Sequence, residues 1–334
     1  MQQKVLVTGG LGYIGSHTII ELIRCGFVVI VVDNFSNSTP EVLDRIEKIT
    51  GERVLFYERD CTNEQDLRGI FQKHNFFGVI HFAALKSVEE SLLFPEKYRK
   101  NNVVSTQVLQ ALSIEFGIEK FVFSSSCTVY GAPDVNPVDE NCVLQSPASV
   151  YGETKQTCEA FLIHGGGLKN LVVLRYFNPI GAHPSGLIGE DSRVAPTNLV
   201  PILCEVALGN KETFQVFGTD YETPDGTCIR DYIHVCDLAR AHVESLRFNQ
   251  KNSVEIINLG VGRGYSVNEV LNVFQQVIGR PISVTYSPRR SGDIPAIWAV
   301  SKRAEFLLNW RCQHSIQEAL EHAWRWALNK NLES

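Results

Sequence analysis

A glycine-rich turn between a strand and a helix constrains this chain more than any other feature. An apolar run from Lys4 to Thr8 predicts a short buried strand, and Gly9, Gly12 and Gly15 follow it at intervals of three residues. Glycines at these spacings allow a tight turn, let a phosphate group approach main-chain N–H groups and let the next helix pack close to the strand. We interpret this segment as a phosphate-binding turn that leads into a helix.

An acidic residue closes the second strand. Residues 28–32 are all apolar, as in a buried parallel strand, and Asp33 follows them directly. A carboxylate at this position can accept hydrogen bonds from the adenosine ribose of a dinucleotide, and its charge repels a 2′-phosphate. The turn and Asp33 together therefore predict a dinucleotide site, with NAD favoured over NADP.

Composition and charge exclude several classes of protein. The chain has 334 residues, 44% of them hydrophobic, and a net charge of -6 without a run of Lys or Arg, so nucleic acid is not an expected partner. We expect neither a signal peptide nor a membrane span, and therefore a cytoplasmic protein. The nine cysteines form no Cys-x-x-Cys pair and no cluster with histidine, so we expect free thiols and no metal site.

Strand and helix patterns keep alternating after Asp33. Strands are predicted at 54–58, 79–82, 120–123 and 171–175, with helices running toward 74, over 95–116 and from about 150. This alternation predicts an α/β fold, a doubly wound parallel sheet of the Rossmann type with sites at the carboxyl ends of its strands.

The pattern becomes less regular beyond Tyr176. We expect a Rossmann domain over 1–177, to which about 233–261 return with a strand at 256–259, and a smaller α+β substrate lobe over 178–334. Capping boxes predict helix starts, each from a hydroxyl residue and an acid or amide three residues later: Thr62 with Gln65, Ser266 with Glu269, and Ser315 with Glu318.

Two residues of the helix near 150 could perform proton transfer. Tyr151 and Lys155 are four residues apart, so their side chains share one helix face. A tyrosine hydroxyl has a pKa of about 10, and a neighbouring ammonium together with a cationic nicotinamide would lower it. The alternative is a packed tyrosine beside a surface lysine, which the dinucleotide turn makes the weaker interpretation.

Three serines follow the strand at 120–123. Because ligands bind at the carboxyl ends of parallel strands, a hydroxyl of Ser124, Ser125 or Ser126 could contact a substrate oxygen. A serine-rich turn that caps the next element is an equally good interpretation of these residues alone.

The motifs taken together resemble a known family. Those of the first half resemble the extended short-chain dehydrogenase/reductases, and those of the second half resemble the UDP-glucose 4-epimerases within it. The first set comprises the glycine turn, Asp33, Asp60, Phe82-Ala83-Ala84-Leu85-Lys86, Asn101, Thr128-Val129-Tyr130-Gly131 and Tyr151-Gly152-x-x-Lys155. The second comprises residues 176–183, Ile188-Gly189-Glu190-Asp191, Asp225-Gly226-Thr227, residues 230–234 and Gly292-Asp293-Ile294-Pro295-Ala296.

The resemblance implies a role for each matching residue. Tyr151 would be the base, Ser126 would share a hydrogen bond with the sugar 4-hydroxyl, and Lys155 would tune Tyr151 and hold NAD. The NAD site would comprise Gly9, Gly12, Tyr13, Ile14, Gly15, Asp33, Asn34, Asp60, Cys61, Phe82, Ala83, Lys86, Asn101, Tyr151, Lys155 and Tyr176. UDP-galactose or UDP-glucose would contact Lys86, Ser126, Tyr151, Asn178, Asn198, Leu199, Phe217, Arg230, Tyr232, Arg290, Asp293 and Ile297.

The implied reaction is a reversible 4-epimerisation. Hydride would pass from carbon 4 of the hexose to NAD, and the 4-keto sugar would turn about its link to the anchored UDP and receive the hydride on its other face. The resemblance also implies a homodimer joined through helices at 95–116 and 150–164.

The arginines fit a pyrophosphate on physical grounds as well. Two fixed guanidinium groups suit a group with two negative charges. Arg289 and Arg290 are adjacent, and the sequence does not decide which one faces the phosphate. For Arg230 an ion pair with Asp231 or Asp237 is the alternative.

The sequence departs from the family pattern at two positions, and two other functions are alternatives to epimerisation. The family often has alanine where this chain has Cys127, and Ile297 falls beside the sugar pocket, where it should crowd an N-acetyl group. A 4,6-dehydratase shares the fold and the Tyr/Lys pair, but it needs an acid after the threonine of the serine loop, and Val129 and Tyr130 stand there. A non-catalytic NAD-sensing protein usually loses the tyrosine or the lysine.

Overall fold

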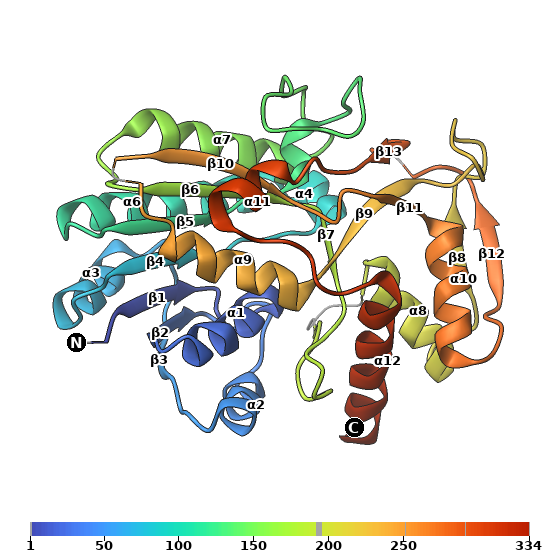
Figure 1. The fold of residues 1–334 in the computed structure, drawn as a ribbon, viewed down its shortest axis with the longest axis horizontal. Coiled ribbons are helices and arrows are strands. Elements are labelled where there is room, and N and C mark those ends of the chain that lie inside the picture. Colours follow the sequence, from blue (N-terminus) through green and yellow to red (C-terminus); the bar gives the residue numbers. More distant parts are fainter. Residues whose placement is uncertain (1, 192–195, 251, 291, 334) are drawn as a thin grey trace.

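A seven-stranded parallel sheet forms the centre of the protein (Figure 1). The computed structural model describes residues 2–191, 196–250, 252–290 and 292–333. The strand order is β10-β6-β5-β4-β1-β2-β3. These strands are β1 (Lys4–Thr8), β2 (Val28–Asp33), β3 (Leu55–Glu58), β4 (Gly78–His81), β5 (Lys120–Ser124), β6 (Leu171–Tyr176) and β10 (Val254–Leu259). Each neighbouring pair is parallel, which confirms the doubly wound α/β fold.

Helices cover both faces of this sheet, and each face has its own core. One core contains side chains of α1 (Tyr13–Arg24), α2 (Glu41–Thr50), α9 (Val235–Arg247) and α11 (Lys302–Leu308). The other contains side chains of α3 (Glu64–Lys73), α6 (Val104–Glu115) and α7 (Val150–Gly165). The middle strands are apolar on both sides because both sides are covered, as the continuous run at 28–32 predicted.

The helix predicted over 95–116 is interrupted. After α4 (Val88–Leu93), the chain forms α5 (Pro95–Tyr98), then a π-helical turn η1 (Arg99–Val103), and then α6. A π-helical turn inserts one residue into the ladder of backbone hydrogen bonds and is frequent at functional sites. The turn contains Asn101, one of the residues expected at the cofactor.

Two of the three predicted capping boxes are present. Ser266 and Glu269 cap α10 (Val267–Ile278) reciprocally, and Ser315 and Glu318 do the same before α12 (Ile316–Glu333). The expected box of Thr62 with Gln65 is wrong. Asn63 caps α3 instead, because its side-chain oxygen accepts from the backbone N–H groups of Gln65 and Asp66.

The remaining elements pack beside the carboxyl edge of the large sheet, on the right in Figure 1. A small sheet contains β7 (Asn178–Ile180), β9 (Ile229–His234), β11 (Gly264–Ser266) and β13 (Ala296–Ile297). A two-stranded sheet contains β8 (Phe214–Phe217) and β12 (Val284–Ser287). Their shared core also includes apolar side chains of α8 (Leu199–Leu208), α10 and α12.

One late segment, with β10 and α9, packs against the first part of the fold. β10 pairs with β6 at the edge of the seven-stranded sheet, and α9 packs against α1. A second such segment was not predicted: Ala304, Leu308 and Trp310 are buried in the same core as α1 and α9. Within the described residues, no helix is both long enough and apolar enough to cross a membrane.

We expect Ile257→Ala to destabilise the protein by about 3 kcal/mol, because the Ile257 side chain in β10 is fully buried and its loss leaves a cavity. Denaturant unfolding monitored by circular dichroism measures the change. Val254→Ala in the same strand is the matched control, since Val254 is 46% exposed and should change stability far less. Equal effects of the two substitutions would contradict a structural role for β10 in the sheet core.

Candidate functional site

The glycine turn joins β1 to α1 through very close backbone contacts. Gly9 has a φ of +65°, and a Cβ on Gly15 would lie 2.5 Å from the carbonyl oxygen of Gly9. The Gly12 N-cap of α1 has no side-chain cap, and the first turn of the helix carries no acidic residue. The N-terminus of α1 therefore presents uncapped backbone N–H groups, which suit an anionic ligand.

Asp33 ties the end of β2 to this turn. One carboxylate oxygen accepts from the backbone N–H of Leu11 at 3.0 Å, and the other accepts from the N–H of Phe35 and the hydroxyl of Ser38, both at 2.9 Å. These bonds fix the orientation of a carboxylate that is only 7% exposed. The oxygen that accepts from Leu11 keeps a further lone pair, with which it could accept a hydrogen bond from a ribose hydroxyl.

The other residues expected at the adenosine end follow the ends of β2 and β3. Asn34 and Asp60 are exposed, and the Asp60 carboxylate accepts from both the N–H and the hydroxyl of Thr62. Cys61 is buried, and burial raises the pKa of its thiol. Cys61 therefore fits a packing position under this part of the site.

The residues after β4 lie beside the turn as well. The backbone N–H groups of Phe82 and Ala83 both donate to the carbonyl of Thr8, which places this strand end next to β1. The side-chain amide of Asn101, in the π-helical turn, donates to the side-chain oxygen of the buried Asn102. That oxygen also accepts from the Leu85 N–H, and the Asn102 amide donates to the Leu85 carbonyl. The π-helical turn thus holds the loop that leads to Lys86.

The serine turn brings the expected catalytic groups together. The Nζ of Lys155 donates to the Ser124 carbonyl at 2.7 Å and lies 5.9 Å from the centroid of the Tyr151 ring. The Ser124 hydroxyl donates to the hydroxyl of Tyr176 at 2.9 Å. Ser126 caps the short helix η2 (Cys127–Tyr130), and its hydroxyl accepts from the Thr128 hydroxyl at 3.0 Å. Helix α7 and the ends of β5 and β6 therefore form one continuous site.

Burial dominates the protonation of this site. It raises the pKa of Tyr151 well above 10, and a hydrogen bond with Ser126 partly offsets that rise. The sequence-based expectation that Lys155 lowers the tyrosine pKa is therefore not what this arrangement produces by itself. Burial also lowers the pKa of Lys155 to about 8, against smaller opposing effects of Cys158 and Glu159.

Glu190 connects Lys86, after β4, with Asn198, before α8. The sequence placed Glu190 within a motif but predicted no role for it. Its carboxylate accepts from Lys86 Nζ at 2.9 Å and from the Asn198 amide at 2.7 Å. Asn198 is exposed and precedes the half-buried Leu199, which begins α8. The sequence did contain a signal for this role, because Glu190 is an acidic residue within a glycine-rich loop. Asn178, also half-buried, lies in β7 and pairs with Tyr232 of β9.

The structure separates the two adjacent arginines. Arg290 donates to Asp293 at 3.0 Å and lies over the ring of Phe217. Arg230 lies 3.8 Å from the same Asp293 carboxylate. Arg289 instead pairs with Asp220 at 2.8 Å. Arg230 and Arg290 are therefore the two guanidinium groups that share one acidic neighbour.

The local ion pairs considered for Arg230 are not the ones that form. Asp231 is fully buried and accepts from the backbone N–H groups of Val261, Gly262 and Ala299. Asp237 pairs with Arg240 at 2.7 Å. These bonds explain both acids as structural residues.

Ile297 contributes to a small core next to the serine turn. It is 2% exposed, lies in β13 beside Arg230, and packs in one cluster with Val129, Tyr130 and Phe177. Its neighbours therefore hold the Ile297 side chain in place, so that its size can limit the volume available to a sugar next to the serine turn.

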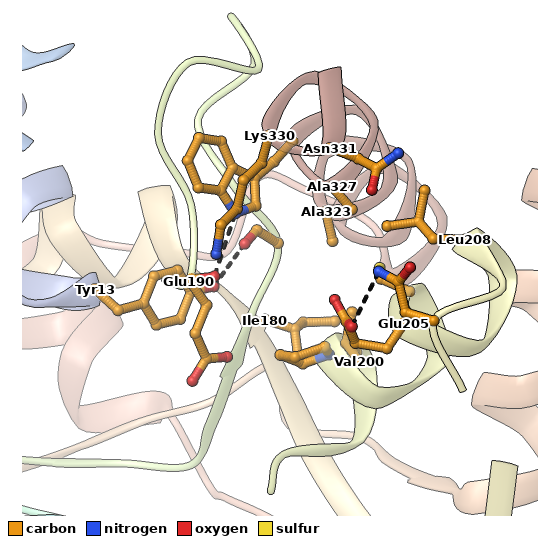
Figure 2. A pocket seen from close by; sticks show the side chains of 15 residues that line it. Tyr13, Ile180, Glu190, Val200, Glu205, Leu208, Ala323, Ala327, Lys330 and Asn331 are labelled. Carbon is orange, nitrogen blue, oxygen red and sulfur yellow. Dashed lines mark hydrogen bonds between the residues drawn. The ribbon is translucent and has the colours of Figure 1, made fainter. Parts of the chain in front are cut away.

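A separate cavity of about 130 Å³ lies between α8 and α12 (Figure 2). Its lining includes Tyr13, whose hydroxyl donates to the Gly181 carbonyl at 2.7 Å, together with Glu190 and Trp326. Neither Tyr151 nor Lys155 lines it. The Tyr13 side chain therefore points toward the second part of the fold, and only its backbone remains at the glycine turn.

Comparison with known proteins gives the family. The model of the NAD dependent epimerase/dehydratase family matches residues 5–260. The chain belongs to this family. It is 43% identical to the UDP-glucose 4-epimerase of Bacillus subtilis, over 96% of each chain.

Solved structures of similar proteins agree with this assignment. The UDP-glucose 4-epimerase of Bifidobacterium longum, in complex with NAD+ and UDP, superposes with a TM-score of 0.95 at 43% identity, covering 98% of this chain and 99% of that one. The enzyme of Stenotrophomonas maltophila, with bound NAD and formylated UDP-arabinopyranose, gives 0.96 at 40% identity with full coverage of both chains.

We expect Gly15→Ala to lower the amount of NAD that copurifies with the protein at least tenfold. The new Cβ must push apart the backbone of the turn, where the Gly9 oxygen lies only 2.5 Å away. NAD released on denaturation, measured per mole of protein, is the readout. Gly69→Ala in α3 is the control, since its Cβ would meet no atom within 4 Å. Full NAD content in the Gly15 variant would contradict the assigned turn.

Proposed function

We propose that this protein is a UDP-glucose 4-epimerase that interconverts UDP-galactose and UDP-glucose with NAD as its cofactor. The observation that carries the proposal is the convergence of Tyr151, Lys155 and Ser126 at the same sheet edge as the glycine turn, with Arg230 and Arg290 from the second part of the chain sharing Asp293. The names of the similar proteins support the same activity.

The described residues fit NAD. The uncapped N-terminus of α1 suits the pyrophosphate, the fixed carboxylate of Asp33 suits the adenosine ribose, and the Lys155 ammonium suits the nicotinamide ribose. We assign residues 1–177 and about 233–261 to NAD and 178–334 to the UDP-sugar. The buried contacts of α11 mean that part of the second range also supports the first.

Proton transfer belongs to Tyr151 and Ser126. NAD held in this site would supply reversible hydride transfer at carbon 4 of the sugar. Tyr151 takes the proton of the 4-hydroxyl as base, and it returns that proton when the carbonyl is reduced. Ser126 donates to the same oxygen, and the positive charge of Lys155 favours the ionised form of Tyr151.

The UDP-sugar is held mainly by its nucleotide. Arg230 and Arg290 bind the pyrophosphate, with support from Asn178, Asn198, Leu199, Phe217, Tyr232 and Asp293. The hexose then contacts few side chains, chiefly Lys86, Ser126, Tyr151 and Ile297. A firm hold on UDP and a loose hold on the sugar let the keto sugar turn over, which inversion at carbon 4 requires.

The structure favours epimerisation over 4,6-dehydration. A dehydratase needs an acid after Thr128, but Val129 and Tyr130 follow it, and both are fully buried in the adjacent core. A non-catalytic NAD-binding role is also less well supported, because the tyrosine and lysine are both present and lie together. The buried Ile297 favours UDP-glucose and UDP-galactose over N-acetylated sugars.

We propose further that the protein is a cytoplasmic homodimer. Exposed apolar side chains gather on the helices expected at the interface and beside them: Leu92, Leu93 and Phe94 follow one another, and Phe161 lies on α7. Such side chains favour a partner surface. All nine cysteines are free thiols, as suits a reducing compartment.

Proton NMR of the protein mixed with UDP-galactose, without added NAD, tests the proposed function. We expect UDP-glucose signals to grow to a fixed ratio, because the same hydride returns and no net oxidation occurs. A 4-keto-6-deoxy product would establish the dehydratase instead. Without any conversion after NAD is supplied, either the substrate or the role of Tyr151 would be wrong.

The pH dependence of kcat should show an alkaline limb near pH 8. The pKa of Lys155 is lowered to about 8, so its ammonium is charged below that pH and loses its proton as the pH rises through it. Loss of the charge removes the stabilisation of ionised Tyr151. Stopped assays in overlapping buffers measure the profile, and in Lys155→Arg the limb should disappear because a guanidinium stays charged.

Substitution of each adjacent arginine should separate their roles. We expect Arg290→Met to raise KM for UDP-galactose at least tenfold, because it removes a charge from the proposed pyrophosphate site. Arg289→Met should change KM less than threefold, since Arg289 pairs with the exposed Asp220. The reverse order would assign the pyrophosphate to Arg289.

A further inference from the structure

The three residues of the serine turn, Ser124, Ser125 and Ser126, contact different partners on helix α7. The Ser124 carbonyl accepts from Lys155, and the Ser126 hydroxyl interacts with Tyr151. The Ser125 hydroxyl points away from the reacting groups and donates to a carboxylate oxygen of Glu159 at 2.5 Å. The middle serine therefore attaches the turn to helix α7 by a bond that the proposed chemistry does not use.

Glu159 is one half of a buried ion pair. Arg175 of β6 donates to both of its carboxylate oxygens, from Nη2 at 2.6 Å and from Nε at 3.0 and 3.2 Å. The two side chains are 3% and 4% exposed. A charge-assisted bond from Ser125 and a forked bond from Arg175 fix the Glu159 carboxylate in one place.

The network extends to two more elements. Arg175 also donates to the Tyr130 hydroxyl at 3.2 Å, and Tyr130 donates to the Asn258 side-chain oxygen of β10 at 2.6 Å. The Asn258 amide in turn donates to the Val138 carbonyl at 3.1 Å. One buried network thus connects α7, the serine turn, β6 and β10.

Stability alone does not account for these charges. Apolar residues of similar volume often stabilise a fold as well as a buried ion pair does, or better. The position of Glu159 gives a more specific reason, since it lies four residues after Lys155 on the same face of α7. It can therefore set the distance between the helix that carries Tyr151 and Lys155 and the turn that carries Ser126.

We propose that Glu159 and Arg175 are positioning residues for epimerisation, acting through the hydroxyl of Ser125 to hold the serine turn against helix α7. The inference rests on the proposed function, and it adds three residues to the machinery of that site. None of the three needs to touch the substrate. Their loss should therefore lower kcat without a matching change in KM, because UDP is held by other residues.

Ser125→Ala tests the link with the smallest change. We expect kcat for UDP-galactose to fall roughly tenfold, as for the loss of a hydrogen bond to a charged group, while KM stays within threefold. Ser113→Ala is the matched control: Ser113 is also buried, and its hydroxyl has no hydrogen-bond partner among the described residues. A kcat of the Ser125 variant within twofold of the parent would overturn the proposal.

A second variant serves if Ser125→Ala does not fold. Glu159→Met combined with Arg175→Met removes both charges, so that neither is left buried and unpaired, and it also removes the acceptor of the Ser125 hydroxyl, while the fold should persist. We expect the same fall in kcat. The alkaline limb should also move to lower pH, because the Glu159 charge raises the pKa of Lys155 and is now absent. The limb reports only the lost charge, so kcat decides: a purely structural pair would leave kcat unchanged, and that result would contradict the proposal.

The parent protein is measured first in the same assay. If it does not convert UDP-galactose, the proposed function fails, and the positioning role is rejected with it. If the parent is active, the kcat values of the variants test the positioning role alone. Bound NAD, measured per mole of each variant, should equal that of the parent, since the network lies on the far side of the serine turn from the glycine turn's contacts.

Discussion

The seven strands of the central sheet run parallel, and this constraint places the rest of the site. Because all carboxyl ends meet at one edge, residues from Thr8 to Leu259 reach a common surface although they are far apart in the sequence. The β1–α1 turn is tightly packed at that edge. Gly9 and Gly15 approach so closely there that no side chain fits between them, and this contact aims the N-terminus of α1 along the edge.

Burial determines how the acid–base groups behave. The interior disfavours both charged forms, so the pKa of Tyr151 rises while that of Lys155 falls to about 8. Near neutral pH the lysine is therefore still mostly charged, whereas the tyrosine stays protonated unless other charges lower its pKa. The carboxylate of Glu159 raises the pKa of Lys155, and Arg175 holds that carboxylate in place.

Local signals made the first part of the fold predictable. β1, the glycine turn and Asp33 are encoded in adjacent residues, and so are the two capping boxes at Ser266 and Ser315. The π-helical turn was not predictable, because its residues Arg99–Val103 include no Pro or Gly that would mark a break in the helix. Asn63 was overlooked as a cap because Thr62 also satisfies the spacing rule. The choice between Arg289 and Arg290 depended on the positions of Asp220 and Asp293, which periodicity does not reveal.

The acidic residues beside Arg230 and Arg290 would affect the release of a UDP-sugar as well as its binding. Asp293 contacts both Arg230 and Arg290, and Glu89 lies 3.9 Å from Arg290. These carboxylates hold the guanidinium groups in position, but they also compete with a pyrophosphate for the same donors. A reversible enzyme must release either UDP-sugar, so an arginine pair without such competition would bind the product too firmly. In the proposed pyrophosphate site, the carboxylates would thus offset part of the attraction that two unopposed guanidinium groups exert on a diphosphate, which favours exchange of the UDP-sugar.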